Sequence, residues 1–307
     1  GVIALLVQPI KRDLQISDTE MGLLIGFAFS FFYMLVGLPM SRVTDVRNRR
    51  NILTIGLSIW SMATALTALA YSYATLFIAR GVVGAGESVK GPTSMSMISD
   101  IVPRSKLPRA MSIYSMGIAG GMAASMIIGG VLLELVKDIT PIHVPGFGLL
   151  RDWQFVFLSC GLPGLLVAAI FFFTVKEPTR KGRKVKGSVP LPDVARFIWS
   201  NKRVYVPLLL SLAIGAIEAF GMTAWRVAFF ERTHGWMPNQ VGPLLGFAAL
   251  LTTPVGLVIG TMIAERLDRQ KIPDAMIRLC LYSNFITVPA AIAMPLMLTP
   301  WLSLGLI

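Results

Sequence analysis

The sequence has 307 residues, of which 54% are hydrophobic and only 14% are charged, and its formal net charge is +12. So few charged side chains cannot cover the surface of soluble domains of this length, which excludes a soluble enzyme or binding module. The basic residues lie between apolar runs rather than on a compact polar domain, so the charge does not indicate a nucleic-acid-binding protein.

Apolar runs long enough to cross a bilayer follow one another along the chain. The hydrocarbon core takes about 20 residues of α-helix, because a helix satisfies its backbone polar groups internally. The short first run, 1–10, opens without charged residues, and the last run stops soon after it begins near 300, so we expect part of a longer chain. Eight full helices are predicted between them, at 21–41, 51–72, 75–101, 107–136, 153–175, 204–230, 240–264 and 273–298. Prolines predict kinks at Pro92, Pro163, Pro254, Pro289 and Pro295.

The connections between these helices alternate in basic content. Those near 42–50, 102–109, 176–203 and 265–271 hold 19 Lys and Arg residues together, whereas the opposite connections hold five. The bias of basic residues toward the cytoplasm predicts that the first set is cytoplasmic, together with any segment before residue 1. The predicted location is therefore the cell (inner) membrane, crossed many times.

The basic connection also divides the predicted spans into groups. We expect an amino-terminal bundle at 1–175, from the end of helix 1 to helix 6, and a cytoplasmic linker at 176–203. A carboxy-terminal bundle follows at 204–307, with helices 7 to 9 and the start of helix 10. We interpret the linker as a solvated loop that also meets anionic headgroups, the alternative being a specific docking site.

An internal repeat supports two related halves. A shift of 220 residues aligns EMGLLIGFA, which begins at Glu20, with QVGPLLGFA, which begins at Gln240, and gives five identities. The same shift places Glu265 and Arg269 in the positions of Asp45 and Arg49. Because equivalent connections have the same orientation, the repeat is parallel and predicts two six-helix halves about an axis along the membrane normal.

The connection after the second helix reads SRVTDVRNRR, Ser41 to Arg50, and resembles the G-x-L-x-D-R-x-G-R-R motif of the major facilitator superfamily. The resemblance implies the superfamily fold of two six-helix bundles. It also implies a polar cytoplasmic latch, which we expect to be loosened by Ser41 in place of the motif's first glycine; the alternative is ordinary flanking charges. The residues expected in this gate are Asp45, Arg49, Arg50, Asp100, Glu265 and Arg269.

The predicted helix at 75–101 carries three charges, Arg80, Glu87 and Lys90. Arg80 and Glu87 are two turns apart on one face, and Lys90 is within reach of Glu87 at i,i+3. Each charge near the bilayer centre costs about 2.5–3.5 kcal/mol, so such residues face a polar cavity and pair there. The alternative is a permanent salt bridge that only sets helix packing.

These charges suggest roles in binding and in proton coupling. A carboxylate whose surroundings alternate between water and a closed cavity can take up and release a proton, so Glu87 is the candidate switch. Arg80 and Lys90 offer positive potential to an anionic headgroup, and arginine matches a phosphate or carboxylate better than lysine does. Glu218, within the span 204–230, is a second membrane-embedded acid that we include in the candidate site.

Three further segments resemble the Spinster-like lysolipid transporters within the superfamily. They read PIKRDLQISDTEMGLL from Pro9, RGVVGAGES from Arg80 and DWQFVFLSCGLPGLL from Asp152. The resemblance implies alternating-access transport of an amphipathic, lysolipid-like anion, with protons as coupling ions. Organic-anion symporters share R-x-x-x-G-x-G-E with this chain but usually carry an aromatic residue where Asp100 stands, so a small organic-anion or drug carrier is the alternative.

A membrane enzyme and a non-transporting sensor are the alternatives from other classes of membrane protein. The two histidines, His143 and His234, lie in separate outward loops, and Cys160 and Cys280 lie within apolar runs as packing residues. Neither pair has metal-ligand spacing, so we predict no enzyme, no metal site and no cofactor. A sensor that binds a ligand without transporting it stays open. The expected partners are the bilayer, an amphipathic or anionic substrate and protons, without nucleic acid, and the expected state is a monomer.

Overall fold

The computed structural model describes residues 2–136, 138, 141–145, 148–181, 190–270, 272 and 274–307. Packing divides the chain into two compact units. Unit 1 contains Gly1–Leu5, Ser112–Glu134 and Arg226–Ile307, and unit 2 contains Leu6–Met111 and Leu135–Trp225. Each unit combines segments that are distant in the sequence, and the division into bundles at 176–203 stays a prediction.

Unit 2 is built from helices and one small hairpin. Its helices are α1 (Val7–Leu14), α2 (Asp18–Gly22), α3 (Phe29–Val46), α4 (Arg49–Leu66), α5 (Tyr73–Glu87), α6 (Lys90–Ile101), α8 (Asp152–Thr174), α9 (Leu191–Ser200) and most of α10 (Lys202–His234). A π-helical stretch, Leu23–Ala28, joins α2 to α3. The strands β1 (Ile142–Val144) and β2 (Gly148–Leu150) are antiparallel, with Ile142 opposite Leu150.

Side-chain caps fix where several of these helices begin. The hydroxyl of Ser17 accepts a hydrogen bond from the backbone N–H of Glu20 at 3.2 Å, and the Glu20 carboxylate accepts one from the Ser17 N–H at 2.8 Å. Asn48 caps α4 through the N–H of Asn51 at 2.9 Å. These bonds satisfy donors that have no partner within the helix, so short polar residues mark the helix starts.

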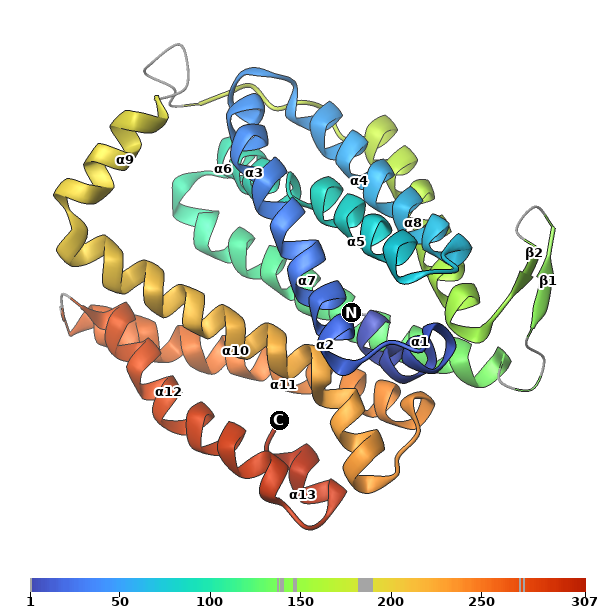
Figure 1. Cartoon of the computed structure of the whole chain (residues 1–307). Helices are drawn as coiled ribbons and strands as arrows, with labels where there is room; N and C mark the ends of the chain where they lie inside the picture. Colours follow the sequence, from blue (N-terminus) through green and yellow to red (C-terminus); the bar gives the residue numbers. More distant parts are fainter. Residues whose placement is uncertain are drawn as a thin grey trace. The chain divides into compact units, whose positions relative to one another are not determined.

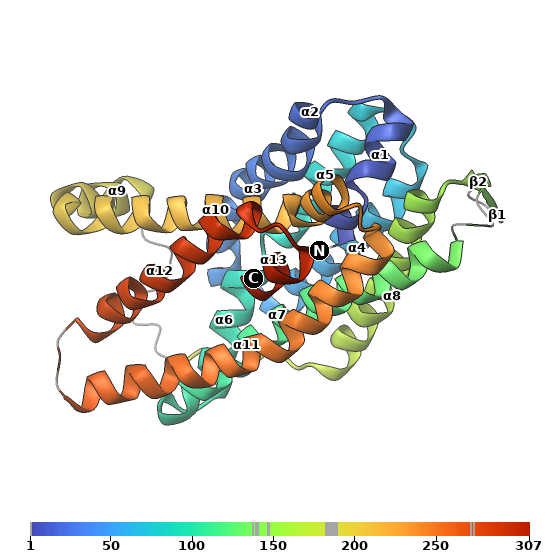
Figure 2. The same ribbon diagram turned by 90° about the horizontal axis from the view of Figure 1, so that it is seen from below.

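Glycines let the helices of unit 2 approach closely. Helices α3 and α4 each pack against α5, and α4 also packs against α8 (Figures 1 and 2). A side chain at Gly84 of α5 would collide with the carbonyl oxygen of Phe29, and one at Gly86 would lie 2.9 Å from the backbone nitrogen of Trp60. Such small-residue contacts hold membrane helices together, because lipid provides no hydrophobic drive between them.

The start of α8 is tied to α1. Trp153 is fully buried, its indole N–H donates to Asp13, and Arg151 pairs with the same carboxylate at 2.9 Å. Gln154 is also buried; its amide donates to the carbonyl of Ala70 at 3.1 Å. These bonds satisfy the polar groups that this crowded end of unit 2 encloses.

Unit 1 packs the middle of α7 (Leu107–Val136) against α11 (Pro238–Arg269). Gly246 of α11 lies against α7, where an added Cβ would be 2.7 Å from the carbonyl oxygen of Ala123, and Asn239 bonds to Glu134. The rest of the unit comprises the end of α10, α12 (Ala275–Ala293), a 3-10 turn (Met294–Leu296) and α13 (Pro300–Gly305). At the end of α10, buried Phe230 stacks on Trp236.

Seven helices of the described chain are long and apolar enough to cross a membrane. Each of them corresponds to one of the eight full spans expected from the sequence. The eighth, 75–101, is interrupted at Ser88 and Val89 between α5 and α6. Pro92 causes the break, since it lacks an N–H and its ring clashes with the carbonyl four residues earlier. The all-α, multi-pass membrane fold is confirmed.

Candidate functional site

Two of the three charged residues of the predicted fourth helix, Glu87 and Lys90, meet at the break between α5 and α6. Glu87 is the last residue of α5, Lys90 is the first of α6, and the two form the expected ion pair. Their side chains are 29% and 34% exposed. The Lys90 ammonium also lies 6.0 Å from the centre of the Trp60 ring, within reach of a cation–π contact.

Arg80 lies two turns before Glu87 on α5 and faces α3. Its guanidinium carbon is 5.3 Å from the centre of the Phe29 ring. Its Nε is buried without a hydrogen-bond partner, and no salt bridge of Arg80 occurs among the described residues. A buried donor with no acceptor is costly in a folded protein, which makes it a position where a ligand oxygen can bind.

Glu218 lies in the middle of α10 and is exposed in unit 2. In the part of the chain that the structure describes, no hydrogen bond or ion pair joins it to Arg80, Glu87 or Lys90. The structure therefore brings Glu87 and Lys90 together, places Arg80 on the same helix as Glu87, and leaves the role of Glu218 as a prediction.

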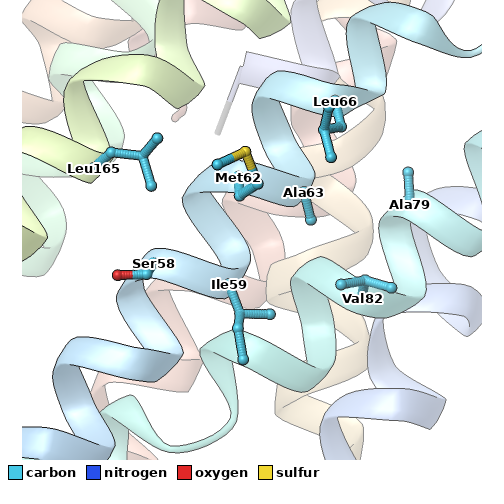
Figure 3. Close-up of a pocket in the computed structure, with 8 residues that line it drawn as sticks. All are labelled: Ser58, Ile59, Met62, Ala63, Leu66, Ala79, Val82 and Leu165. Carbon is cyan, nitrogen blue, oxygen red and sulfur yellow. The ribbon is translucent and has the colours of Figure 1, made fainter.

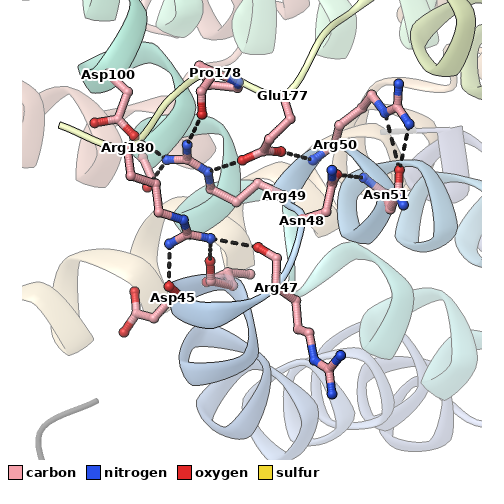
Figure 4. Close-up of polar contacts among 12 residues, drawn as sticks. Asp45, Arg47, Asn48, Arg49, Arg50, Asn51, Asp100, Glu177, Pro178 and Arg180 are labelled. Carbon is pink, nitrogen blue, oxygen red and sulfur yellow. Dashed lines mark hydrogen bonds and ion pairs between the residues drawn. The ribbon is translucent and has the colours of Figure 1, made fainter. Parts of the chain in front are cut away.

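A second polar cluster surrounds Arg49, the first residue of α4. Its fully buried guanidinium donates to Asp100, to the Ser96 hydroxyl at 2.8 Å, to the Glu177 carboxylate at 2.8 Å and to the Pro178 carbonyl at 2.9 Å (Figure 4). The planar fork of arginine can serve several acceptors at once. One side chain thus connects α4, α6 and the segment after α8.

The two carboxylates of this cluster are further fixed by backbone N–H groups. Asp100 accepts from the N–H of Lys181 at 2.9 Å, and Glu177 accepts from the N–H of Arg50 at 2.8 Å. Burial raises the pKa of Glu177, but the bonds from Arg50 and Arg49 outweigh it, so the pKa lies below its ordinary value of 4.5. The charged form of Glu177 is therefore the one that this site stabilises.

The residues after α8 also close the end of α3. The Arg180 guanidinium donates to the carbonyl oxygens of Thr44 at 2.8 Å, of Arg47 at 2.6 Å and of Asp45. The last carbonyls of a helix lack partners within it, and a cation satisfies them well. Glu177 and Arg180 were missing from the predicted gate, although KEPTR, residues 176–180, resembles the E-P-x-R ending common in the major facilitator superfamily.

The other predicted gate residues lie as follows. Arg50 contributes its N–H, while its side chain bonds Asn51 at 3.1 Å, and Asp45 contributes its carbonyl oxygen to Arg180. In unit 1, Arg269 and Glu265 approach within 3.6 Å and are both exposed. The contact between Arg49 and Asp100 is thus present as expected, and a gate that joins the two halves stays a prediction.

An apolar pocket shares no lining residue with either polar cluster (Figure 3). Residues of α4, α5 and α8 line it: Ser58, Ile59, Met62, Ala63, Leu66, Ala79, Val82 and Leu165. Its lining carries no charge, so it supplies apolar contact surface and none of the groups that recognise an anion.

The remaining candidates for chemistry are scattered. His143 lies on β1 rather than in a loop, and His234 ends α10, where its ring packs against Phe229 and Phe230. The interpretation of His234 as a loop residue was wrong, because the apolar residues before it continue the helix. No group of three or more potential metal ligands occurs among the described residues.

Comparison with known proteins places the chain in a family. The Major Facilitator Superfamily model matches residues 1–307. The MFS-type efflux pump of Mycolicibacterium smegmatis is 23% identical over 94% of this chain and 63% of its own length. Protein spinster homolog 1 of Xenopus tropicalis is 26% identical over 86% of this chain and 51% of its own length. The chain thus spans about half to two thirds of these relatives.

Solved structures agree. The crystal structure of a bacterial homolog to the human lysosomal transporter Spinster, inward-facing and unoccupied, matches with a TM-score of 0.76 and 27% identity. The match covers 99% of this chain and 67% of that protein. A second crystal structure of a bacterial Spinster homolog, inward-facing and occupied, matches with a TM-score of 0.72 and 27% identity. The chain belongs to the Major Facilitator Superfamily and is a Spinster-like member of it.

Proposed function

We propose that this chain is part of a secondary active transporter that works by alternating access and carries an amphipathic, lysolipid-like or other organic anion. The observation that carries the proposal is the set of three charges on α5 and at the α5–α6 break, Arg80, Glu87 and Lys90. Charges cost about 2.5–3.5 kcal/mol each near the bilayer centre, so a sequence keeps three of them there only where they meet water, a partner or a substrate.

The anion is proposed to bind at Arg80. Its Nε is buried without a hydrogen-bond partner, and a phosphate or carboxylate oxygen supplies the acceptor it lacks. Phe29, against which the guanidinium packs, limits its movement and so keeps its donors directed. The apolar tail of the substrate then lies against the hydrophobic side chains that dominate the spans.

Proton coupling is proposed to act through Glu87. In the structure its carboxylate pairs with Lys90. When Glu87 takes up a proton it becomes neutral, and the Lys90 ammonium loses its partner and becomes available to the substrate anion. When the substrate leaves, Lys90 pairs with Glu87 again and favours release of the proton. Protonation and anion binding thus support each other at one ion pair.

The Arg49 cluster is proposed to act as a cytoplasmic latch. It gathers α4, α6 and the segment after α8 around one buried guanidinium. Because a buried ion pair is stable only when every charge in it keeps its partners, such a cluster favours two discrete arrangements rather than gradual opening. The repeat assigns Glu265 and Arg269 the equivalent place in the second half.

The test is radiolabelled lysolipid counterflow in proteoliposomes that contain the complete protein. Arg80→Ala is expected to weaken substrate affinity about 10- to 100-fold, since a charge-assisted hydrogen bond contributes about 1.5–3 kcal/mol. Arg80→Lys keeps the charge without the planar fork, so its substrate affinity should lie between those of the wild type and Arg80→Ala. Lys106→Ala, which changes an exposed lysine of a connection, is the control.

Glu87→Gln separates coupling from binding. Counterflow, which needs no net proton movement, should persist in this variant, whereas uptake driven by a pH gradient should be lost. If the Glu87→Gln variant took up substrate at the wild-type rate in a pH gradient, Glu87 would have no role in proton coupling. Ligand binding without any counterflow in the wild type would instead indicate a sensor.

A small organic-anion or drug carrier is the second candidate function. The similarity to a mycobacterial efflux pump and, at 22% identity, to multidrug resistance protein 1 of Bacillus subtilis favours it. Competition in the counterflow assay distinguishes the two, because a drug carrier is inhibited by compact organic anions without an acyl chain, and a lysolipid carrier requires the chain.

A further inference from the structure

Helix α9 in the basic connection has two chemically different faces. Its polar side chains recur at intervals of three and four residues: Asp193, Arg196 and Ser200. The apolar side chains occupy the rest of the circumference: Val194 and Ile198 lie away from the polar set, and Phe197 and Trp199 lie at the two edges. This spacing places each set on one side of an α-helix, so α9 is amphipathic over its whole length.

The apolar face of α9 is open. Val194 is 39% exposed, Phe197 56% and Trp199 70%. A soluble protein buries the apolar face of such a helix, because leaving it in water forgoes about 25 cal/mol for every Å² of apolar surface. We therefore expect the exposed apolar face of α9 to contact an apolar medium rather than water.

The position of α9 identifies that medium. Only Asn201 separates it from α10, a helix long and apolar enough to cross the membrane. Asn201 donates to the carbonyl of Phe197 at 2.9 Å, and the chain turns there (Figure 1). Helix α9 therefore lies at the level where α10 enters the bilayer, and it leaves the direction of that span.

The side chains at the junction are those of a membrane interface. The Lys202 ammonium lies 5.2 Å from the centre of the Trp199 ring, and Phe197 meets Tyr205 edge to face at 5.7 Å between centroids. Tryptophan and tyrosine favour the headgroup level, where one end of the ring is wet and the other apolar. Lysine beside them reaches the lipid phosphates.

The charge of the connection selects the kind of lipid. In the sequence, residues 176–203 carry nine Lys and Arg residues and only two acidic residues, Glu177 and Asp193. Each basic residue near an anionic leaflet strengthens attachment about fivefold. Arg196, Lys202 and Arg203 lie on α9 or directly after it, so they are placed to act together.

We propose that α9 is an interfacial anchor, which lies in the headgroup region of the leaflet on its own side of the membrane and binds anionic phospholipid. Val194, Phe197 and Trp199 enter the boundary of the acyl chains, and Arg196, Lys202 and Arg203 contact the phosphates. This anchor is independent of the transport proposal, because it involves none of the residues proposed to bind substrate or protons.

The test places an environment-sensitive NBD label on either face of α9 in the complete protein, after replacement of its native cysteines, Cys160 and Cys280 among them. Val194→Cys reports the apolar face and Ser200→Cys the polar face. Proteins are reconstituted in phosphatidylcholine vesicles with or without roughly 30 mol% phosphatidylglycerol. With the anionic lipid, the label at 194 should emit at shorter wavelength and be quenched by acrylamide several-fold less than the label at 200.

A triple variant, Arg196→Gln, Lys202→Gln and Arg203→Gln, tests the charges. It should lose the response of the label at 194 to phosphatidylglycerol while keeping the thermal midpoint of its parent in detergent. Equal quenching of the two labels in anionic vesicles would overturn the anchor. Equal shielding of the label at 194 in vesicles with and without phosphatidylglycerol would overturn it as well, because the face would then not respond to anionic phospholipid.

Discussion

At the scale of single residues, the Arg49 cluster is the most constrained polar site of unit 2. Its guanidinium is 1% exposed, and the Asp100 and Glu177 side chains with which it pairs are 9% and 23% exposed. Removing one member of such a cluster leaves the others charged and partly buried. We therefore expect the loss of any one member to destabilise the folded protein, because its former partners stay charged and partly buried.

Arg49→Ala should lower the free energy of unfolding by about 3 kcal/mol, since it leaves two carboxylates without their counter-charge. Arg47→Ala is the matched control, because Arg47 is exposed and only its carbonyl oxygen takes part in the site. Thermal unfolding of the complete protein in detergent measures both. Equal midpoints for the two variants would contradict the role of Arg49.

The lowered pKa of Glu177 predicts a pH dependence with a definite sign. The folded protein holds this carboxylate charged, so the unfolded chain takes up its proton first as the pH falls. The stabilisation is fully present above the ordinary pKa of 4.5 and is lost as the pH falls through the lower folded value. Between pH 7 and pH 4 the wild type should therefore lose more stability than Glu177→Gln.

Asp193→Asn is the control for this comparison. Asp193 is an exposed carboxylate outside the cluster, so its removal should leave the wild-type decline between pH 7 and pH 4 in place. The prediction fails if the stabilities of Glu177→Gln and Asp193→Asn decline in parallel between pH 7 and pH 4. The pKa of Glu177 would then be the same in the folded and the unfolded chain.

Only some residues of the Arg49 cluster were predicted from the sequence. Arg49 was predicted because it occupies a motif position, and Asp100 because the resemblance implies a latch partner at the cytoplasmic end of the helix at 75–101. Glu177 was not, because it meets Arg49 across 128 residues of sequence and no local periodicity records such a contact. The ion pair of Glu87 and Lys90 was predicted, because its spacing of three residues is local.

At the scale of helices and strands, close packing of α3 on α5 positions the charged site. Gly84→Ala would place a Cβ against the carbonyl oxygen of Phe29, the residue on which Arg80 packs. Backbone cannot move aside as a flexible side chain does, so the helices must separate, at a cost of about 1–3 kcal/mol. The variant should lower the thermal midpoint in detergent and weaken substrate binding.

Gly117→Ala in α7 is the matched control. An added Cβ at Gly117 meets nothing within 4 Å, and alanine is the better helix former. Its midpoint should equal or exceed that of the wild type. A Gly84→Ala protein with unchanged midpoint and affinity would show that α3 and α5 tolerate separation.

The long helices were predicted from the sequence, whereas the short helix α9 and the two short strands were not. Eight full spans were predicted, because about 20 apolar residues leave a helix as the only structure that satisfies the backbone in lipid, and seven of them are single long helices in the structure. The break before Lys90 followed from Pro92, whose chemistry is local. Helix α9 and the hairpin of β1 and β2 were missed, because a ten-residue amphipathic segment and two three-residue strands lie within connections that were classified by charge.

At the scale of the whole molecule, orientation in the membrane depends on the distribution of basic residues. One set of connections holds 19 Lys and Arg residues and the opposite set five, and basic residues are retained on the cytoplasmic side during insertion. Every proposal that names a side, including the latch around Arg49, depends on this orientation. The internal repeat requires the same orientation for both halves.

Single cysteines in opposite connections test the orientation. Lys106 and Leu149 are both exposed, and they lie in connections predicted to be cytoplasmic and outward-facing respectively. In intact cells that express the complete protein without its native cysteines, a membrane-impermeant maleimide should label Leu149→Cys and leave Lys106→Cys unlabelled until the cells are permeabilised. The reverse pattern would place the Arg49 cluster on the outer side, where it could not act as a cytoplasmic latch.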